Sequence, residues 1–162
     1  SESEEIEADA GRGIYGVTKL MSEAIVRQRC PNHLILRCVA LLGKYARKNS
    51  LLRIVNDEPC VLTLSGDSRF NYVLHSDVSD FISFALDNHL KGTYNVASSC
   101  DVALSQVADM MGKKVNFGDY RYDVGNIDNC KITSIFPAIK KTSEDVVVEF
   151  VGERVGWRGQ CA

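Results

Sequence analysis

The sequence lacks two features that would assign it at once to a large class of proteins. It contains no apolar run near the roughly 20 residues that a membrane-spanning helix needs. It also contains no basic stripe, and its formal net charge is −2. Proteins that bind DNA or RNA concentrate Lys and Arg on one face. We therefore expect no membrane segment, and no nucleic acid as the main partner.

Cysteine and histidine are present, but not in the patterns that hold a metal ion. The six cysteines are widely scattered without a C-x-x-C pair, and the three histidines are not at metal-ligand spacing. Most of the cysteines lie in apolar stretches, where a free thiol behaves as a small hydrophobic group. We expect reduced thiols in a cytoplasmic protein, and no metal site.

The composition is that of one globular domain, with 162 residues of which 45% are hydrophobic and 25% are charged. We expect an N-terminal arm over residues 1–13, where acidic side chains dominate up to Asp9. The folded domain is expected over residues 14–153, and a short tail over residues 154–162.

The most informative stretch is Tyr15-Gly-Val-Thr-Lys19, which opens a segment whose apolar residues recur at helical spacing. We expect a helix to about Arg29, ended by Pro31. Tyr15 and Lys19 are four residues apart, so they share one face of that helix. A nearby ammonium lowers the pKa of a tyrosine, which lets the phenol act as a general acid or base near neutral pH. Tyr-x-x-x-Lys alone is a weak motif that many surface helices also carry.

Helices and strands alternate along the rest of the chain, which predicts an α/β fold. His33–Leu42 is apolar almost without alternation, as is typical of a strand buried on both faces of a parallel sheet. The other expected strands are short and half-polar, so we expect the edge of a large parallel sheet plus a small mixed lobe. These strands are Cys60–Leu64, Phe70–His75, Thr93–Ala97 and Val115–Phe117. Helix caps are expected at Ser76 or Asp77, at Asp101, at Asp128 and at Thr142.

Several segments, taken in order, resemble the C-terminal half of an extended short-chain dehydrogenase/reductase, the NAD-dependent epimerase/dehydratase family. Tyr15–Lys19 with Glu23 resembles the catalytic helix of that family, and Leu36–Gly43 resembles the strand that follows it. Later matching segments are Gly66-Asp67, Tyr72–Val78, Tyr94–Ala97 and Asp128–Lys131. The resemblance implies a partial Rossmann-like fold that carries the Tyr-x-x-x-Lys helix, plus the small mixed substrate lobe.

The resemblance also implies roles for individual residues. In that family the tyrosine exchanges a proton with a substrate hydroxyl or carbonyl while a hydride moves to or from the nicotinamide. The lysine hydrogen-bonds the nicotinamide ribose and lowers the pKa of the tyrosine. Tyr15 and Lys19 would thus be catalytic and cofactor-binding, with Val39 near the nicotinamide of NAD or NADP. Many members act on nucleotide sugars, so a nucleotide-sugar-like small molecule is the implied substrate.

The sequence departs from the family pattern at several points. It has no G-x-x-G-x-x-G turn after a strand, which is the element that binds cofactor phosphates at a helix N-terminus. The family's catalytic serine or threonine would lie before Ser1, and Ser3 is a poor replacement in its acidic arm. Ala40 and Phe70 stand where many nucleotide-sugar enzymes carry an asparagine and an arginine, although Arg69 is adjacent and could bind substrate instead.

These observations leave alternative hypotheses. In the first, the chain is the catalytic-helix and substrate-lobe portion of an NAD(P)-dependent epimerase, dehydratase or reductase, truncated and inactive without its cofactor-binding half. In the second, it is a free-standing, non-catalytic oligomeric module. In a third, it binds a nucleotide or sugar through Arg37, Arg69 or Arg121. A helix and a strand taken from a parallel sheet expose apolar surface, so we expect as partner the missing N-terminal half or another copy, with a dimer through the Tyr15 helix favoured.

Overall fold

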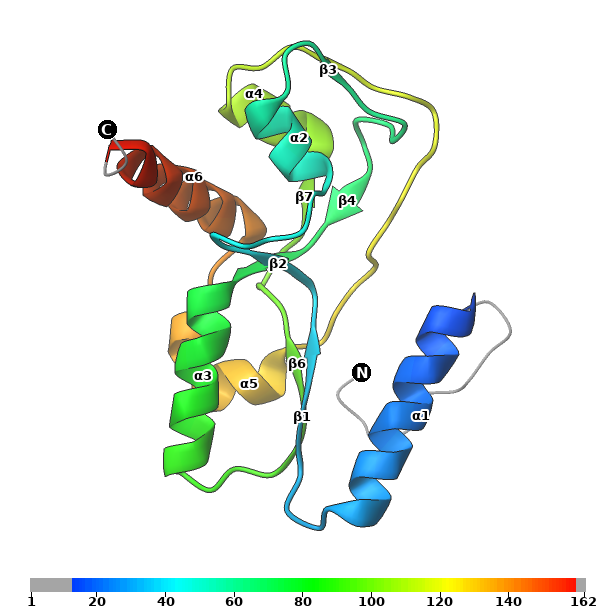
Figure 1. Ribbon diagram of the computed structural model, residues 1–162, viewed down its shortest axis with the longest axis vertical. Coiled ribbons are helices and arrows are strands. Elements are labelled where there is room, and N and C mark those ends of the chain that lie inside the picture. The colour runs from blue at the N-terminus through cyan, green and yellow to red at the C-terminus, as the bar shows by residue number, and fades with distance from the viewer. Residues whose placement is uncertain (1–12, 160–162) are drawn as a thin grey trace.

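The computed structural model describes residues 13–159, which form two lobes along the long axis of the molecule (Figure 1). The lower lobe in that view contains two parallel strands with helices around them. These elements are α1 (Gly13–Arg29), β1 (Leu34–Cys38), α3 (His75–Asp87), β6 (Gly92–Val96), α5 (Cys130–Ile135) and a 3-10 turn, η2 (Pro137–Ile139).

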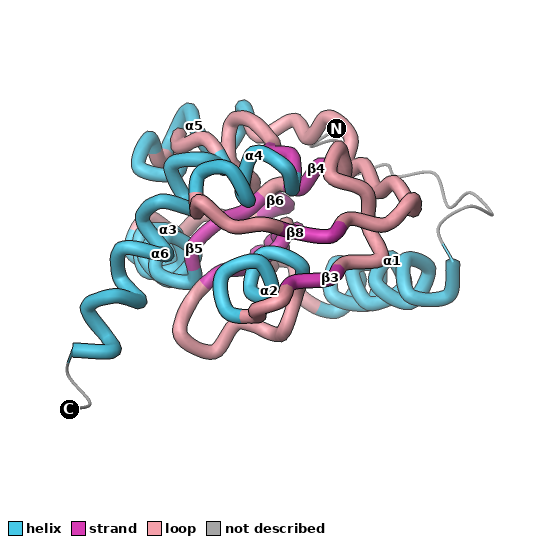
Figure 2. Tube along the Cα trace, turned by 90° about the horizontal axis from the view of Figure 1, so that it is seen from above, coloured by secondary structure: helices cyan, strands magenta, loops and turns pink. Residues whose placement is uncertain are grey.

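The upper lobe is a small mixed unit. It contains α2 (Ser50–Asn56), β3 (Cys60–Val61), β4 (Arg69–Phe70), β7 (Val102–Ala103), α4 (Leu104–Met110) and β8 (Val115–Asn116). Two further strands, β2 (Ala40–Leu42) and β5 (Tyr72–Leu74), pair where the lobes meet, and α6 (Ser143–Gly159) packs against β5. Seen from above, α1 and α6 lie on opposite sides of the molecule (Figure 2).

The strands of the described chain form four two-stranded sheets. β1 pairs with β6, β2 with β5 and β3 with β8 in parallel, whereas β4 and β7 are antiparallel. The expected α/β class with parallel pairing is therefore confirmed. Within residues 13–159, β1 has a strand on only one of its two edges.

The expected strand over His33–Leu42 is divided at Val39. The Val39 amide donates to Val96 O at 3.2 Å, whereas the next amide, of Ala40, donates to Asn71 O at 3.2 Å. The chain thus passes from β6 to β5 as its hydrogen-bonding partner at this point. The expected strand Phe70–His75 is likewise divided at Asn71, whose side chain bonds to the backbone of Ser98.

Each lobe has its own hydrophobic cluster. In the upper lobe, side chains from α2, α4 and α6 surround fully buried Leu42 and Tyr72. In the lower lobe, Phe81 lies at the centre of an aromatic group, with the rings of Tyr94 and Phe136 at 5.4 and 5.6 Å. This packing fixes β5, β6 and α3, and it leaves α1 outside both clusters.

Some expected helix ends are confirmed and others are wrong. Thr142 caps α6 reciprocally with Asp145, because each side chain accepts a hydrogen bond from the other residue's amide at 3.1 and 2.9 Å. Neither Ser76 nor Asp77 caps α3, which begins at His75 with Leu74 in the capping position. Asp101 does not cap α4 either, since β7 intervenes and the N-cap of α4 is Ala103.

The expected boundaries at the two termini differ in outcome. Residues 154–159, expected as part of a tail, continue α6 as helix. Residues 1–12 of the expected acidic arm lie outside the described residues. None of the helices within residues 13–159 combines the length and the hydropathy that a membrane-spanning segment requires.

Candidate functional site

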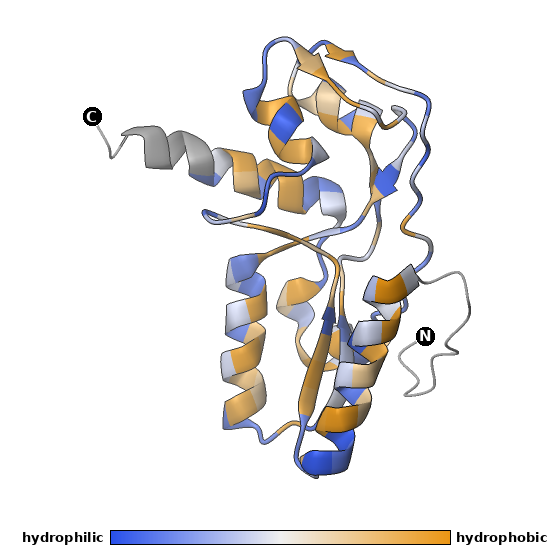
Figure 3. Cartoon of the chain, turned by 45° about the vertical axis from the view of Figure 1, so that its right-hand side comes forward, coloured by the Kyte–Doolittle hydropathy of each residue, from blue (hydrophilic) through white to orange (hydrophobic). Residues whose placement is uncertain are grey.

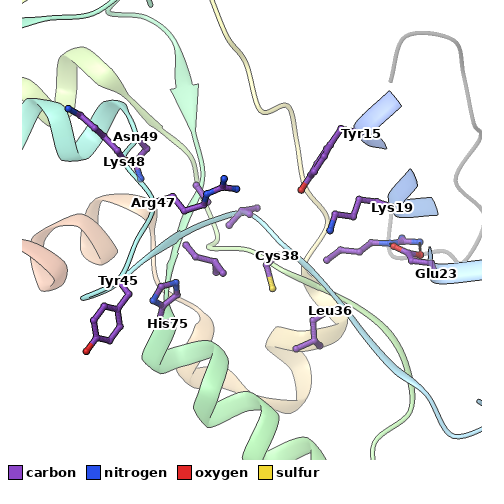
Figure 4. A pocket seen from close by; sticks show the side chains of 14 residues that line it. Tyr15, Lys19, Glu23, Leu36, Cys38, Tyr45, Arg47, Lys48, Asn49 and His75 are labelled. Carbon is purple, nitrogen blue, oxygen red and sulfur yellow. Dashed lines mark hydrogen bonds and ion pairs between the residues drawn. The ribbon is translucent and has the colours of Figure 1, made fainter. Parts of the chain in front are cut away.

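A cleft of about 740 Å³ lies between α1, the segment where β1 passes into β2, and the loop after β2 (Figure 4). Helix α1 contributes Tyr15, Lys19 and Glu23 to it. Because these residues are spaced by four, a single helix face supplies all three side chains. The opposite wall comes from Tyr45, Arg47, Lys48 and Asn49, and from His75 at the start of α3.

Tyr15 and Lys19 form the exposed end of this helix face. The Lys19 Nζ lies 5.4 Å from the centre of the Tyr15 ring. Both polar ends point into the cleft (Figure 4). Tyr15 is 76% exposed, so its hydroxyl is accessible to a ligand. The pair therefore offers a phenol and an ammonium side by side to whatever enters the cleft.

Val39 lines the same cleft, beside the point where the chain changes sheets. Three of the four site residues expected from the sequence, Tyr15, Lys19 and Val39, are thus brought together. Arg69 is not among them. It lies on β4 and lines a separate cleft of about 460 Å³.

Arg69 is engaged by an acidic partner in that second cleft. Its Nη2 donates to Asp101 Oδ1 at 2.7 Å, and this hydrogen bond holds the pKa of Asp101 below its usual range. The side chains of Arg69 and Asp101 remain 38% and 26% exposed. To bind a phosphate group of a ligand, Arg69 would first have to give up its hydrogen bond to the Asp101 carboxylate.

Glu23 occupies the inner end of the α1 face. Its carboxylate accepts from Arg37 Nε and Nη2 at 2.9 and 2.8 Å, and from Arg27 Nη2 at 2.9 Å. The pKa of Glu23 is lowered, chiefly by the hydrogen bond from Arg37 and also by the charges of Arg37 and Arg27. Partial burial of the carboxylate acts in the opposite direction but does not outweigh them. Glu23 is therefore a carboxylate at neutral pH, and it joins α1 to β1.

Sequence reasoning missed the basic wall of the cleft. Arg47 and Lys48 lie on the loop after β2, both exposed, and neither makes an ion pair with another of the residues 13–159. With Lys19 and Arg37 they give the lining four cations against the single carboxylate of Glu23. The signal in the sequence was the run Lys44-Tyr-Ala-Arg47-Lys48 directly after the end of an apolar strand.

His75 was also missed as a lining residue, and Gly43 explains its position. A Cβ atom at Gly43 would overlap the His75 ring. Only glycine lets the imidazole lie this close to the end of β2, where it lines the cleft.

The three arginines proposed from the sequence as contacts of a binding module are all ion-paired. Arg37 contacts Glu23, and Arg69 contacts Asp101. Arg121 lies 3.7 Å from Asp67 and 3.6 Å from Asp123. The pairing favours a structural role for each guanidinium, and it weakens the hypothesis of a nucleotide- or sugar-binding module built on them.

No family model and no curated protein matches the sequence. Solved structures do match. A dTDP-4-dehydrorhamnose reductase from Yersinia enterocolitica matches with a TM-score of 0.67 and 21% identity over 85% of this chain and 55% of that one. The Bacillus anthracis reductase of the same name, in complex with NADP, matches with a TM-score of 0.70 and 18% identity. That match covers 92% of this chain and 58% of the reductase. A Thermus thermophilus UDP-glucose 4-epimerase in complex with NAD matches with a TM-score of 0.62 and 17% identity. That match covers 85% of this chain and 54% of the epimerase.

The chain spans a little over half the length of these solved proteins. At such identities the likeness shows the fold. It confirms the architecture expected from the resemblance, which is a partial Rossmann-like unit with a Tyr-x-x-x-Lys helix and a small mixed lobe. This chain has the fold of the corresponding part of the extended short-chain dehydrogenases/reductases.

Proposed function

We propose that this chain supplies the catalytic helix and substrate lobe of an NAD(P)-dependent epimerase, dehydratase or reductase acting on a nucleotide sugar. The observation that carries the proposal is the common orientation of Tyr15 and Lys19 into a cleft that Val39 also lines. The solved structures of similar fold that hold NADP and NAD support the choice of cofactor.

The residues present fit one end of that cofactor. An exposed ammonium and phenol beside apolar Val39 suit a ribose hydroxyl and a nicotinamide ring. The described residues contain no glycine-rich turn to hold the pyrophosphate, so the fit covers the nicotinamide end only. When bound, the cofactor supplies or accepts the hydride.

In this proposal each side chain has a separate task. Lys19 would donate a hydrogen bond to the ribose of a bound cofactor, and it places a positive charge beside the phenol. The Tyr15 hydroxyl gives its proton to the substrate oxygen when a carbonyl is reduced, and takes it back when an alcohol is oxidised. The Arg47 and Lys48 wall attracts an anionic substrate to the cleft.

The rest of the cofactor site must come from further polypeptide. β1 has one edge without a strand in the described chain, and Leu34 and Leu36 on it are only half-buried. An unpaired edge presents free N–H and C=O groups to another strand. We propose that a cofactor-binding half, with a glycine-rich turn, adds a parallel strand at this edge.

A second copy of the chain is the proposed partner of the outer face of α1. Ile14, Val17, Met21 and Ile25 recur at intervals of three and four on the side of α1 away from Tyr15 and Lys19. All four are exposed, and Figure 3 shows apolar residues along the helix. An isologous dimer would pair this face with itself.

The proposal is tested by titrating NADH and NADPH into the chain alone, and into the chain joined to the N-terminal half of the B. anthracis reductase. We expect binding only in the joined protein, and a loss of about tenfold in affinity for Lys19→Met. The matched control is Lys114→Met, an exposed lysine in the upper lobe. The proposal would be contradicted if Lys19→Met and Lys114→Met bound NADH and NADPH with equal affinity. It would also be contradicted if the joined protein folded but bound neither cofactor.

The non-catalytic oligomeric module remains the second candidate, because α1 exposes so much apolar surface. In that case the chain would self-associate, and Tyr15→Phe would alter no measurable property. An effect of Tyr15→Phe on proton transfer in the joined protein, with unchanged folding, would exclude this candidate. The two candidates are thus separated by one conservative substitution.

We further propose a reducing compartment, the cytoplasm, for the protein. The cysteines within residues 13–159 are all free thiols. Cys38 is exposed and lines the cleft, so an oxidising environment would leave it open to modification.

A further inference from the structure

Helix α1 is attached to the rest of the described structure by polar contacts. None of its residues is buried, and none belongs to either hydrophobic cluster. In most proteins the packing of an amphipathic face fixes the position of a helix. Of the apolar side chains of α1 only Leu20 is half-buried, so polar interactions have a large share in setting the distance and rotation of α1 relative to β1.

The Glu23 carboxylate provides such interactions. It accepts two hydrogen bonds from Arg37 on β1, in the fork geometry that fixes orientation as well as distance. Arg27, one turn further along α1, donates to Glu23 at 2.9 Å and to Thr93 Oγ1 on β6 at 3.1 Å. Glu23 and Arg37 are only 13% and 15% exposed, so water competes little for these bonds.

The same helix face carries the candidate catalytic pair. Glu23 follows Lys19 by one turn and Tyr15 by two turns, so a rotation of α1 that broke the Glu23 contacts would also turn Tyr15 and Lys19 out of the cleft. We propose that Glu23 is a positioning residue: through Arg37 and Arg27 it holds α1 at the angle that directs Tyr15 and Lys19 into the cleft. The importance of that angle for cofactor binding rests on the proposed function.

The first measurement is hydrogen–deuterium exchange of the whole chain, with α1 and α3 followed separately. Glu23→Gln keeps the shape of the side chain but presents an amide nitrogen, which cannot accept, to one of the arginine donors. We expect α1 amides to lose protection about tenfold and α3 amides to lose clearly less, since the contact that is removed holds α1. Arg37→Lys, which keeps the charge but not the fork, should give a smaller loss and stands in if Glu23→Gln does not fold.

The matched control is Arg29→Gln, which removes a charge from an exposed position on the same helix. We expect α1 protection within about twofold of the original protein. Unchanged α1 protection in both Glu23→Gln and Arg37→Lys would overturn the proposal. Equal loosening of α1 and α3 would overturn it as well, because the whole fold would then be destabilised.

The second measurement separates this inference from the proposed function. In the chain joined to a cofactor-binding half, Glu23→Gln should raise the Kd for NADPH about tenfold, in step with the loosening of α1. If Glu23→Gln loosens α1 but leaves this Kd unchanged, the positioning role is wrong. If the joined protein without substitutions binds no cofactor, the proposed function fails, and the exchange data alone decide whether Glu23 holds the helix.

Discussion

The ammonium of Lys19 lies 5.4 Å from the centre of the Tyr15 ring, and both side chains reach into one cleft from a helix that buries none of its residues. The functional groups of Tyr15 and Lys19 can therefore be removed with little effect on the stability of the fold. Substituting either residue removes a functional group without opening a cavity, so their effects on folding and on ligand binding can be measured independently.

Tyr15→Phe and Lys19→Met should therefore leave stability almost unchanged. Both side chains are exposed, and exposed substitutions away from caps and ion pairs alter the free energy of unfolding by about 0.5 kcal/mol or less. Urea unfolding followed by circular dichroism checks this. A loss above about 1 kcal/mol in either variant would show that the pair has a structural role, and would complicate its use in binding experiments.

Two adjacent valines of α6 provide a test of the upper-lobe core. Val147 is fully buried and Val148 is 58% exposed. Val147→Ala should cost about 2 kcal/mol, from lost burial and the cavity that remains. Val148→Ala should be neutral or slightly stabilising, because alanine has the higher helix propensity. Thermal unfolding of the two variants compares them directly, and equal stabilities would contradict the packing of α6.

The ion pair of Glu23 predicts a specific dependence of stability on pH. The pKa of Glu23 is lowered in the folded state, so its contribution is complete above the unfolded value of about 4.3 and is lost as the pH falls through the folded value. We expect Glu23→Gln to lower the free energy of unfolding by about 1 kcal/mol at pH 7, because the glutamine keeps one acceptor oxygen and loses only the charge-assisted part of the interaction. Urea unfolding at pH 7 and at lower pH should show this difference shrinking on acidification, and a difference that grows would contradict the assignment.

The features that could be predicted from the sequence are those fixed by nearby residues. The α1 helix, the shared face of Tyr15 and Lys19, and the Thr142 cap all depend on residues within four positions of one another. The division of His33–Leu42 at Val39 could not be read in the same way. It depends on β5 and β6, which follow more than 30 residues later in the chain.

The same distinction explains the outcome for the candidate site. Asp101 has the local pattern of a helix cap, but its carboxylate pairs with Arg69, 32 positions earlier in the chain. The cations Arg47 and Lys48 line the cleft across from α1, from which β1 and β2 separate them in the chain, and no local periodicity encodes that arrangement. Tyr15, Lys19 and Val39 come together because α1 and β1 are connected by a short turn.

The outer face of α1 predicts the oligomeric state. Ile25 is 58% exposed on that face, and a charge there would be buried in a dimer. We expect a dimer in sedimentation equilibrium, and a monomer for Ile25→Asp. Ile82→Asp is the control, on α3, where the side chain is 38% exposed. A monomeric original protein, or an Ile25→Asp variant that stays dimeric, would contradict this arrangement.

The role of Tyr15 as proton donor is tested most directly by the rate at which the chain, joined to a cofactor-binding half, oxidises NADPH with a nucleotide-linked 4-keto sugar. We expect Tyr15→Phe to slow this reaction by about 10²-fold or more while the Kd for NADPH changes by about threefold at most, because Lys19 keeps its contact with the cofactor and the proton transfer is lost. Equal rates for the two proteins would contradict the assignment of Tyr15 as the acid, and with it the proposed use of this cleft.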